Sequence, residues 1–166
     1  MSKAFTRESD DAPEQPIAPR VMATPAGKNY ITPGGEEKLR AELDRLMQLK
    51  LATGSPPDDA AKREQQTLTQ KIQQFQQTLA SVTVVEPPAK PWEQVLFGAT
   101  VTVRDGAGAE FRYRIVGVDE TDLERDWISW LSPVARALLK AKLGQRVQVQ
   151  LPGGTREWEI TGIIFE

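Results

Sequence analysis

Apolar residues recur with helical spacing in the first half of the chain. From residue 68 onward they step by four and three, the spacing of a coiled-coil seam. The positions are Leu68, Ile72, Phe75, Leu79 and Val82. Because the residues between them are mostly Gln, this pattern predicts a helix with one apolar face and a solvated opposite face.

A shorter stripe precedes it, at Leu39, Leu43 and Leu46. Thr32 is expected to be the N-cap of this first helix, with Pro33 at the first helical position. Two helices joined by a short linker pack antiparallel. The pattern therefore predicts a helical hairpin.

The linker between the two stripes reads GSPPDD. Gly54 is expected to end the first helix. Ser55 is expected to be the N-cap of the second helix, with Pro56 at its first position and Asp58 closing a capping box. An acidic tip that holds a metal through Asp58 and Asp59 is the alternative. Adjacent helical residues point about 100° apart, so chelation of one ion by both is awkward, and their default role is to stabilise the helix dipole.

The period changes to two after a Pro-rich segment, and this change predicts strands. A Ser-Pro start, with Ser132 as N-cap, and Gly144 as the last residue predict one helix among them. The expected strands are VLFGATVTV, EFRYRIVGV, WISWL, RVQVQL and REWEITGIIFE. Five strands and one helix predict a small α+β domain with a mostly antiparallel sheet.

Four segments are therefore expected along the chain. Residues 1–29 are rich in Pro, Ala and acidic residues and are expected to be a disordered tail, with a docking peptide as the alternative. The antiparallel coiled-coil hairpin is expected over 30–85, a Pro-rich linker over 86–94 and the sheet domain over 95–166.

Composition removes several classes of function. The chain of 166 residues has a net charge of -2 and contains neither His nor Cys. Disulfides, thiol catalysis, Ser-His-Asp triads and the usual zinc sites are thereby excluded. The charge gives no reason to expect tight nonspecific DNA binding. With no signal peptide and no apolar run of about 20 residues, a cytoplasmic protein without membrane association is expected.

An acidic loop, VDETDLERD, offers a second candidate metal site. A Ca²⁺ site would need the glycine and the closing Glu of an EF-hand loop, and the loop has neither. A solvated acidic turn is the favoured interpretation. Its carboxylates are Asp119, Glu120, Asp122, Glu124 and Asp126.

Three stretches carry a family pattern. The sheet domain contributes FGATVTV, YRIVGVDETD, ISWLSPVARALLKAKLG and LPGG, and REQQ lies at Arg63–Gln66 in the second helix. The first helix contributes Ile31, Thr32, Gly35, Lys38, Leu39, Glu42 and Leu43. From about residue 30 to the end, the chain resembles the GreA/GreB family of transcript cleavage factors, and SPVARALLK is most similar to the GreB branch.

The resemblance implies a coiled-coil hairpin joined to an FKBP-like C-terminal domain. It also implies a bacterial, cytoplasmic transcription elongation factor that acts as a monomer on RNA polymerase. In this family the C-terminal domain docks on the rim of the polymerase's secondary channel and the hairpin enters it, with at most indirect contact to nucleic acid. Two acidic tip residues help to hold a second Mg²⁺ in the polymerase's own active site. The factor itself is then neither an enzyme nor the holder of a resident metal or cofactor.

The tip departs from the family pattern G-D-x-x-E-N-A-E-Y. If REQQ is aligned, the two acidic positions fall on Ala52 and Ser55. The first helix is also about ten residues short, which removes about 15 Å of reach. A Mg²⁺ ligand must lie within about 2.1 Å of the ion. We therefore expect modulation of transcription without efficient cleavage, with cleavage through Asp58 and Asp59 as the alternative.

The resemblance places the polymerase contact around Leu131, Ser132 and Pro133. Leu131 stands where family segments such as IDSP carry Asp. Trp130 is a candidate aromatic anchor and Arg136 a candidate partner for an acidic surface. Ser132 and Pro133 would also cap the following helix in any case.

Two further hypotheses remain open. One is an adaptor whose hairpin dimerises through Phe75, Leu79 and Val82. The other is an FKBP-like prolyl isomerase with an aromatic pocket. Its candidate lining residues are Phe97, Phe111, Tyr113, Trp127, Trp130 and Trp158.

Overall fold

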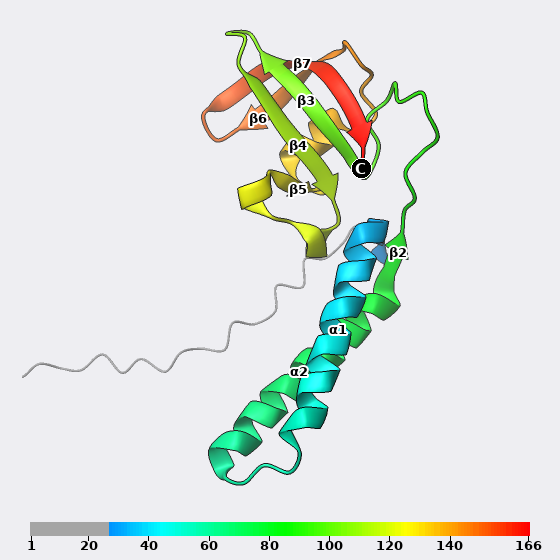
Figure 1. Cartoon of the computed structure of the whole chain (residues 1–166). Coiled ribbons are helices and arrows are strands. Elements are labelled where there is room, and N and C mark those ends of the chain that lie inside the picture. Colours follow the sequence, from blue (N-terminus) through cyan, green and yellow to red (C-terminus); the bar gives the residue numbers. More distant parts are fainter. Residues whose placement is uncertain (1–26) are drawn as a thin grey trace, which may run out of the picture.

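The structure, a computed structural model, describes residues 27–166. Most of the tail expected over 1–29 lies outside these residues. Figure 1 shows a long helical hairpin that projects from a sheet domain. The helices are α1 (Pro33–Thr53) and α2 (Asp59–Ser81). Within the described residues, every helix is too short or too polar to span a lipid bilayer.

The first helix begins and ends where its sequence predicts. The Thr32 side chain accepts a hydrogen bond from the Gly35 backbone N–H at 3.0 Å, and Pro33 occupies the first turn. Gly54 is the C-cap, with φ of 55°, a conformation that favours glycine. The predicted roles of Thr32, Pro33 and Gly54 are confirmed.

The second helix begins later than expected. Its N-cap is Asp58, whose carboxylate accepts a hydrogen bond from the Ala61 N–H at 2.7 Å. The expectations that Ser55 is the N-cap, that Pro56 is the first helical residue and that Asp58 closes a capping box are wrong. Pro57 restricts the preceding Pro56 to extended backbone and has no N–H of its own to offer a cap, so a helix cannot start at this pair.

The hairpin has a small core and a closed base. Leu46, Leu68 and Ile72 are buried between the helices, with Leu43 and Phe75 packed against them. At the base, β1 (Asn29–Ile31) pairs in parallel with β2 (Val82–Val84). The last position of the predicted stripe, Val82, therefore belongs to a strand and not to the helix.

The sheet domain has the five strands and single helix that its sequence predicts. The strands are β3 (Ala99–Asp105), β4 (Glu110–Val116), β5 (Trp127–Ser129), β6 (Arg146–Leu151) and β7 (Gly154–Phe165). Their order is β5-β4-β3-β7-β6. All neighbours are antiparallel except β4 and β5. The predicted α+β class is confirmed.

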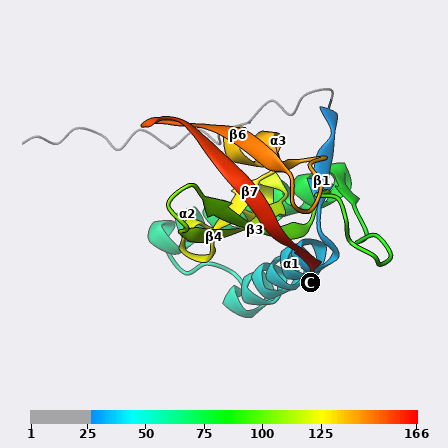
Figure 2. The same ribbon diagram turned by 90° about the horizontal axis from the view of Figure 1, so that it is seen from above.

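The helix α3 (Pro133–Leu138) lies against one face of this sheet (Figure 2). It ends well before Gly144, so the predicted longer helix is wrong. The Lys140 N–H donates to the Val95 carbonyl at 2.7 Å, and the Val95 N–H donates to the Ala141 carbonyl at 2.8 Å. Pairing with this distant segment overrides the local helical preference.

The core of the domain lies between α3 and the sheet. Alternate residues of β3, including Val101 and Val103, are fully buried and pack with Leu138 and Trp158. The predicted period of two therefore places the apolar side chains on one face, as expected for a sheet covered on one side.

Candidate docking surface and hairpin tip

The two acidic residues at the hairpin tip both have local structural partners. The Asp58 carboxylate caps α2 through the Ala61 N–H. Asp59 forms an ion pair with Lys62 at 2.9 Å, and its side chain is 86% exposed. These contacts are those expected of acidic residues in the first turn of a helix.

The two positions predicted to correspond to the family's acidic pair carry no acidic side chain. Ala52, in the last turn of α1, and Ser55, in the loop, are both exposed. Within the part of the chain that the structure describes, no three carboxylates gather in a way that could hold a metal ion.

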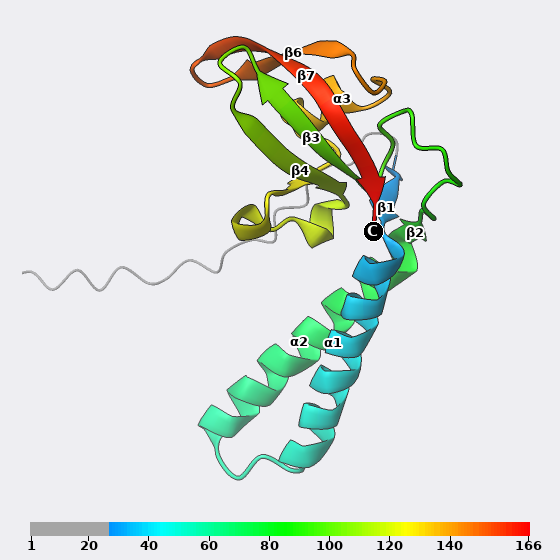
Figure 3. The same ribbon diagram turned by 45° about the horizontal axis from the view of Figure 1, so that its top comes forward.

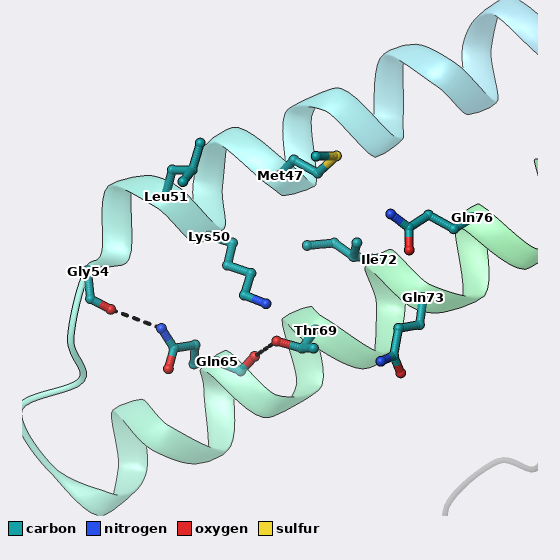
Figure 4. A pocket seen from close by; sticks show the side chains of 9 residues that line it. All are labelled: Met47, Lys50, Leu51, Gly54, Gln65, Thr69, Ile72, Gln73 and Gln76. Atoms are coloured by element: carbon teal, nitrogen blue, oxygen red, sulfur yellow. Dashed lines mark hydrogen bonds between the residues drawn. The ribbon is translucent and has the colours of Figure 1, made fainter.

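The end of α1 is held by α2 rather than left open. The Gln65 side-chain amide donates to the Gly54 carbonyl at 2.9 Å, across the mouth of the loop (Figure 4). The Thr53 hydroxyl donates to the carbonyl of Lys50 at 2.9 Å. These bonds satisfy helix carbonyls that would otherwise lack partners, so the tip is a capped turn.

A groove of about 590 Å³ lies between the helices just below the tip. In Figure 4, Met47 and Leu51 of α1 border it opposite Ile72 and the Gln side chains of α2. Leu51 is 73% exposed and Met47 is 42% exposed. The groove is therefore mainly apolar.

The predicted polymerase-binding residues follow one another from the end of β5 into α3. The Ser132 side chain accepts a hydrogen bond from the Ala135 N–H at 3.1 Å, so its predicted role as N-cap is confirmed. Pro133 and Arg136 are exposed, whereas Leu131 and Ser132 are half-buried. The accessible part of this candidate surface is the outer side of α3.

Trp130 faces the hairpin. Its ring lies 5.1 Å from the ring of Tyr30, which precedes α1, and the Tyr30 ring lies 5.8 Å from that of Phe97. Trp130 is half-buried by this packing. Its role as an anchor for the polymerase stays a prediction. Its contact with Tyr30 joins the sheet domain to the hairpin.

Basic side chains lie around α3. Arg136, Lys140 and Lys142 are exposed. Within residues 27–166, none of the three forms an ion pair. They give this side of the domain positive charge that an acidic surface of a partner could meet.

The aromatic side chains named for an isomerase pocket are divided among separate places. Phe111 and Tyr113 stack on Trp158 with ring separations of 5.8 Å and 5.7 Å. Burial raises the pKa of the Tyr113 hydroxyl, and the nearby Asp126 carboxylate raises it further. Phe97 and Trp130 belong instead to the Tyr30 cluster. The six predicted residues therefore do not line one pocket.

The acidic loop serves the structure of the domain and its junction with the hairpin. Asp122 accepts a hydrogen bond from the Glu124 N–H at 3.0 Å and pairs with Arg125 at 3.3 Å. Asp119 accepts a hydrogen bond from the Asn29 side chain at 3.2 Å. Glu120 binds the start of α1 through the Thr32 N–H, at 2.9 Å. Sequence reasoning missed this junction, because Thr32 lies 88 positions before Glu120 in the chain.

The residues through which an adaptor would dimerise are already partly covered within this chain. Phe75, Leu79 and Val82 are each half-buried. Phe75 already packs against the hairpin core, and Val82 is committed to β2.

Comparison with known proteins gives a consistent picture. Residues 89–165 match the family model "Transcription elongation factor, GreA/GreB, C-term". The chain is 34% identical over 154 residues to transcription elongation factor GreB of Neisseria meningitidis, covering 83% of this chain and 94% of that protein. It is 38% identical over 152 residues to transcription elongation factor GreA of Alkalilimnicola ehrlichii, covering 81% and 96%.

Among solved structures, the chain is similar to the transcription elongation factor GreA/GreB of Nitrosomonas europaea. The two are 25% identical, with a TM-score of 0.43, over 83% of this chain and all of that one.

Proposed function

The chain belongs to the GreA/GreB family of transcription elongation factors, and from this premise we propose that it binds bacterial RNA polymerase at the rim of the secondary channel. The hairpin then occupies the channel without efficiently stimulating transcript cleavage. The protein modulates transcription as a channel occupant and is not itself an enzyme.

The observation that carries the proposal is the chemistry of the tip. Asp58 is used as a helix cap and Asp59 pairs with Lys62. Turning Asp58 toward a metal would leave the Ala61 N–H without its cap, at a cost of about 1 kcal/mol. The two residues are adjacent at the start of a helix, so they do not fit the role of a pair that holds one Mg²⁺ between them.

The size of the hairpin points the same way. The helix α1 has 21 residues, which gives it a length of about 32 Å at about 1.5 Å per residue. The tip is closed by the bond from Gln65 to Gly54. Beyond that bond lie only the loop and the first turns of α2, whose acidic residues Asp58 and Asp59 have the local partners described above.

The docking side of the proposal uses the outer face of α3. Pro133 and Arg136 are exposed there, and Lys140 adds charge beside them. An exposed proline in a rigid first helical turn presents a fixed apolar contact, and the neighbouring cations suit an acidic rim. Trp130 precedes this surface in the chain and packs against Tyr30.

The test uses backtracked transcription complexes. A limiting amount of a true cleavage factor is added to them, with or without an excess of this protein. We expect an excess of this protein to suppress RNA shortening, because both proteins compete for one channel. The double variant Pro133→Ala/Arg136→Glu should lose the suppression. A matched charge reversal on the opposite face of the sheet, Arg104→Glu, should keep it, because Arg104 alternates with Val103, which is buried on the face that α3 covers. Failure of the wild-type protein to suppress shortening, together with no binding to the polymerase, would sink the proposal.

A further inference from the structure

The junction between the hairpin and the sheet domain is organised around one carboxylate. Glu120 lies at the end of a single 3₁₀ turn, Val118–Glu120, that follows β4. One of its oxygens accepts hydrogen bonds from the Thr32 N–H and the Gly117 N–H, each at 2.9 Å. The other accepts a hydrogen bond from the Thr32 hydroxyl. Both carboxylate oxygens are thus committed, one to the hairpin alone and the other to both parts of the molecule.

The contact on the hairpin side is the N-cap of α1. The Thr32 hydroxyl donates to Glu120 and also accepts from the Gly35 N–H, so the carboxylate is coupled to the first turn of the helix. Thr32 is only 5% exposed. Negative charge at a helix N-terminus is favoured by the helix dipole, and hydrogen bonds to a charged group are stronger than neutral ones.

Two glycines make room for this carboxylate. A Cβ on Gly35 would lie 2.1 Å from a Glu120 carboxylate oxygen. A Cβ on Gly117 would lie 2.9 Å from the other oxygen and 2.2 Å from the Tyr30 carbonyl oxygen. Gly34, the neighbour of Gly35 in the same helical turn, has no atom within 4 Å of such a Cβ. The requirement for glycine at residue 35 is therefore a requirement for space beside Glu120.

An exposed hydrogen bond from the Asn29 side chain to Asp119, at 3.2 Å, joins the same two surfaces, and the remaining contacts have less directional constraint. Tyr30 packs between Phe97 and Trp130. The Lys38 ammonium of α1 lies 4.6 Å from the centre of the Trp127 ring. Aromatic and cation–π contacts tolerate sliding, whereas the two hydrogen bonds that the Thr32 N–H and hydroxyl donate to one carboxylate define an orientation, and the Gly117 N–H holds that carboxylate in place.

We propose that Glu120 is a positioning residue that fixes the direction of the hairpin relative to the sheet domain. Figure 3 shows α1 beginning directly beneath the sheet domain, so a small rotation at this point moves the far tip by a large distance. The second part of the inference rests on the proposed function. A protein docked through its sheet domain can insert the hairpin only when this junction holds the direction of α1.

The chain suits a direct test because it contains no cysteine. Spin labels at Gln70→Cys on α2 and Gln148→Cys on β6 occupy exposed positions in the two parts. Double electron–electron resonance spectroscopy then measures the distance between the two labels. We expect one narrow distance distribution in the wild-type background and its loss in Gly35→Ala and Glu120→Ala. Gly34→Ala is the matched control and should keep the narrow distribution.

Glu120→Gln separates the role of geometry from that of charge. An amide oxygen can accept from the Thr32 N–H and the Gly117 N–H, and the amide nitrogen can donate to the Thr32 hydroxyl. We expect this variant to keep the narrow distribution, which a generally unfolded or expanded chain would not do. Circular dichroism checks that each variant retains its helices. An unchanged distribution in both Gly35→Ala and Glu120→Ala, with the helices intact, would overturn the proposal.

A polymerase experiment then tests the second part separately. A photocrosslinker at Ser55 reports whether the tip lies inside the channel, and a pull-down reports binding of the whole protein. We expect Glu120→Ala to keep binding but lose the tip crosslink, while Gly34→Ala keeps both. If wild-type protein neither binds nor crosslinks, the proposed function fails while the distance measurement still stands. If Glu120→Ala crosslinks as wild type does, the link between junction and insertion is overturned.

Discussion

The two ends of the hairpin use carboxylates in opposite ways. At the base, the Glu120 carboxylate accepts hydrogen bonds from three donors in two parts of the molecule, and two glycines leave space for it. At the tip, Asp58 and Asp59 are exposed, and among residues 27–166 each has only a partner within three residues of itself. The base of the hairpin, which sets its direction, is held by contacts between residues far apart in the chain. The acidic residues at the tip, where family members have their metal-binding pair, make local contacts at the start of α2.

This comparison teaches where substitutions should matter. A change at the base should alter the stability and direction of the hairpin together. A change at the tip should alter neither by much, and it should leave transcription unaffected if the tip has no catalytic part. Four predictions test this contrast, in decreasing order of expected effect.

Glu120→Ala should have the largest effect. It leaves the buried Thr32 and Gly117 N–H groups without acceptors, and a loss of about 2–4 kcal/mol in the free energy of unfolding is expected. Urea denaturation followed by circular dichroism measures it. Glu124→Ala, which removes an exposed carboxylate from the same acidic loop, is the matched control and should change stability by less than about 0.5 kcal/mol. An equal loss of stability in the two variants would show that Glu120 contributes no more than an exposed carboxylate of the same loop.

The two adjacent glycines of α1 should respond with opposite signs. Gly35→Ala should destabilise the protein by about 1–3 kcal/mol because its methyl group displaces the Glu120 side chain. Gly34→Ala should stabilise it by up to about 1 kcal/mol, since alanine is the better helix former and has open space there. The shift of the thermal midpoint gives both signs. Stabilisation by both substitutions would contradict the close approach of Glu120.

Asp58→Ala should have a moderate effect that stays local. Loss of the N-cap should cost about 1 kcal/mol, and Asp58→Ser should recover most of it because serine caps equally well. Hydrogen exchange should show faster opening of the first turn of α2 only. Protection of α1 near Thr32 should not change, and a change there would mean that the two ends are coupled.

Asp59→Asn should have the smallest effect. Its ion pair with Lys62 is a solvent-exposed pair between neighbouring turns, which contributes less than about 0.5 kcal/mol. Denaturation at low and high salt measures the difference in stability, which should shrink at high salt because dissolved ions screen an exposed ion pair. A loss several times larger would show that Asp59 has a partner beyond Lys62.

The parts of the fold that depend on local rules could be predicted from the sequence. Thr32, Pro33, Gly54 and Ser132 take their predicted capping roles because a cap needs only a few neighbouring residues. The strands of the sheet domain follow from their period of two, and the hairpin follows from its apolar stripes.

The parts that depend on distant partners could not be predicted in this way. Glu120 looks like one member of a solvated acidic turn, but its partner Thr32 lies 88 positions away. The end of α3 is likewise set by pairing with Val95. The start of α2 is different, because the restriction that Pro57 places on Pro56 was a local signal and was overlooked.

The most direct test of the account compares the wild-type protein with the double variant Asp58→Asn/Asp59→Asn on backtracked transcription complexes, with no other cleavage factor present. The measured quantity is the rate of RNA shortening. The account predicts that the rate of RNA shortening with either protein equals the rate of the polymerase alone, because neither carboxylate serves the catalytic metal. A clear acceleration by the wild-type protein that the double variant lacks would contradict it.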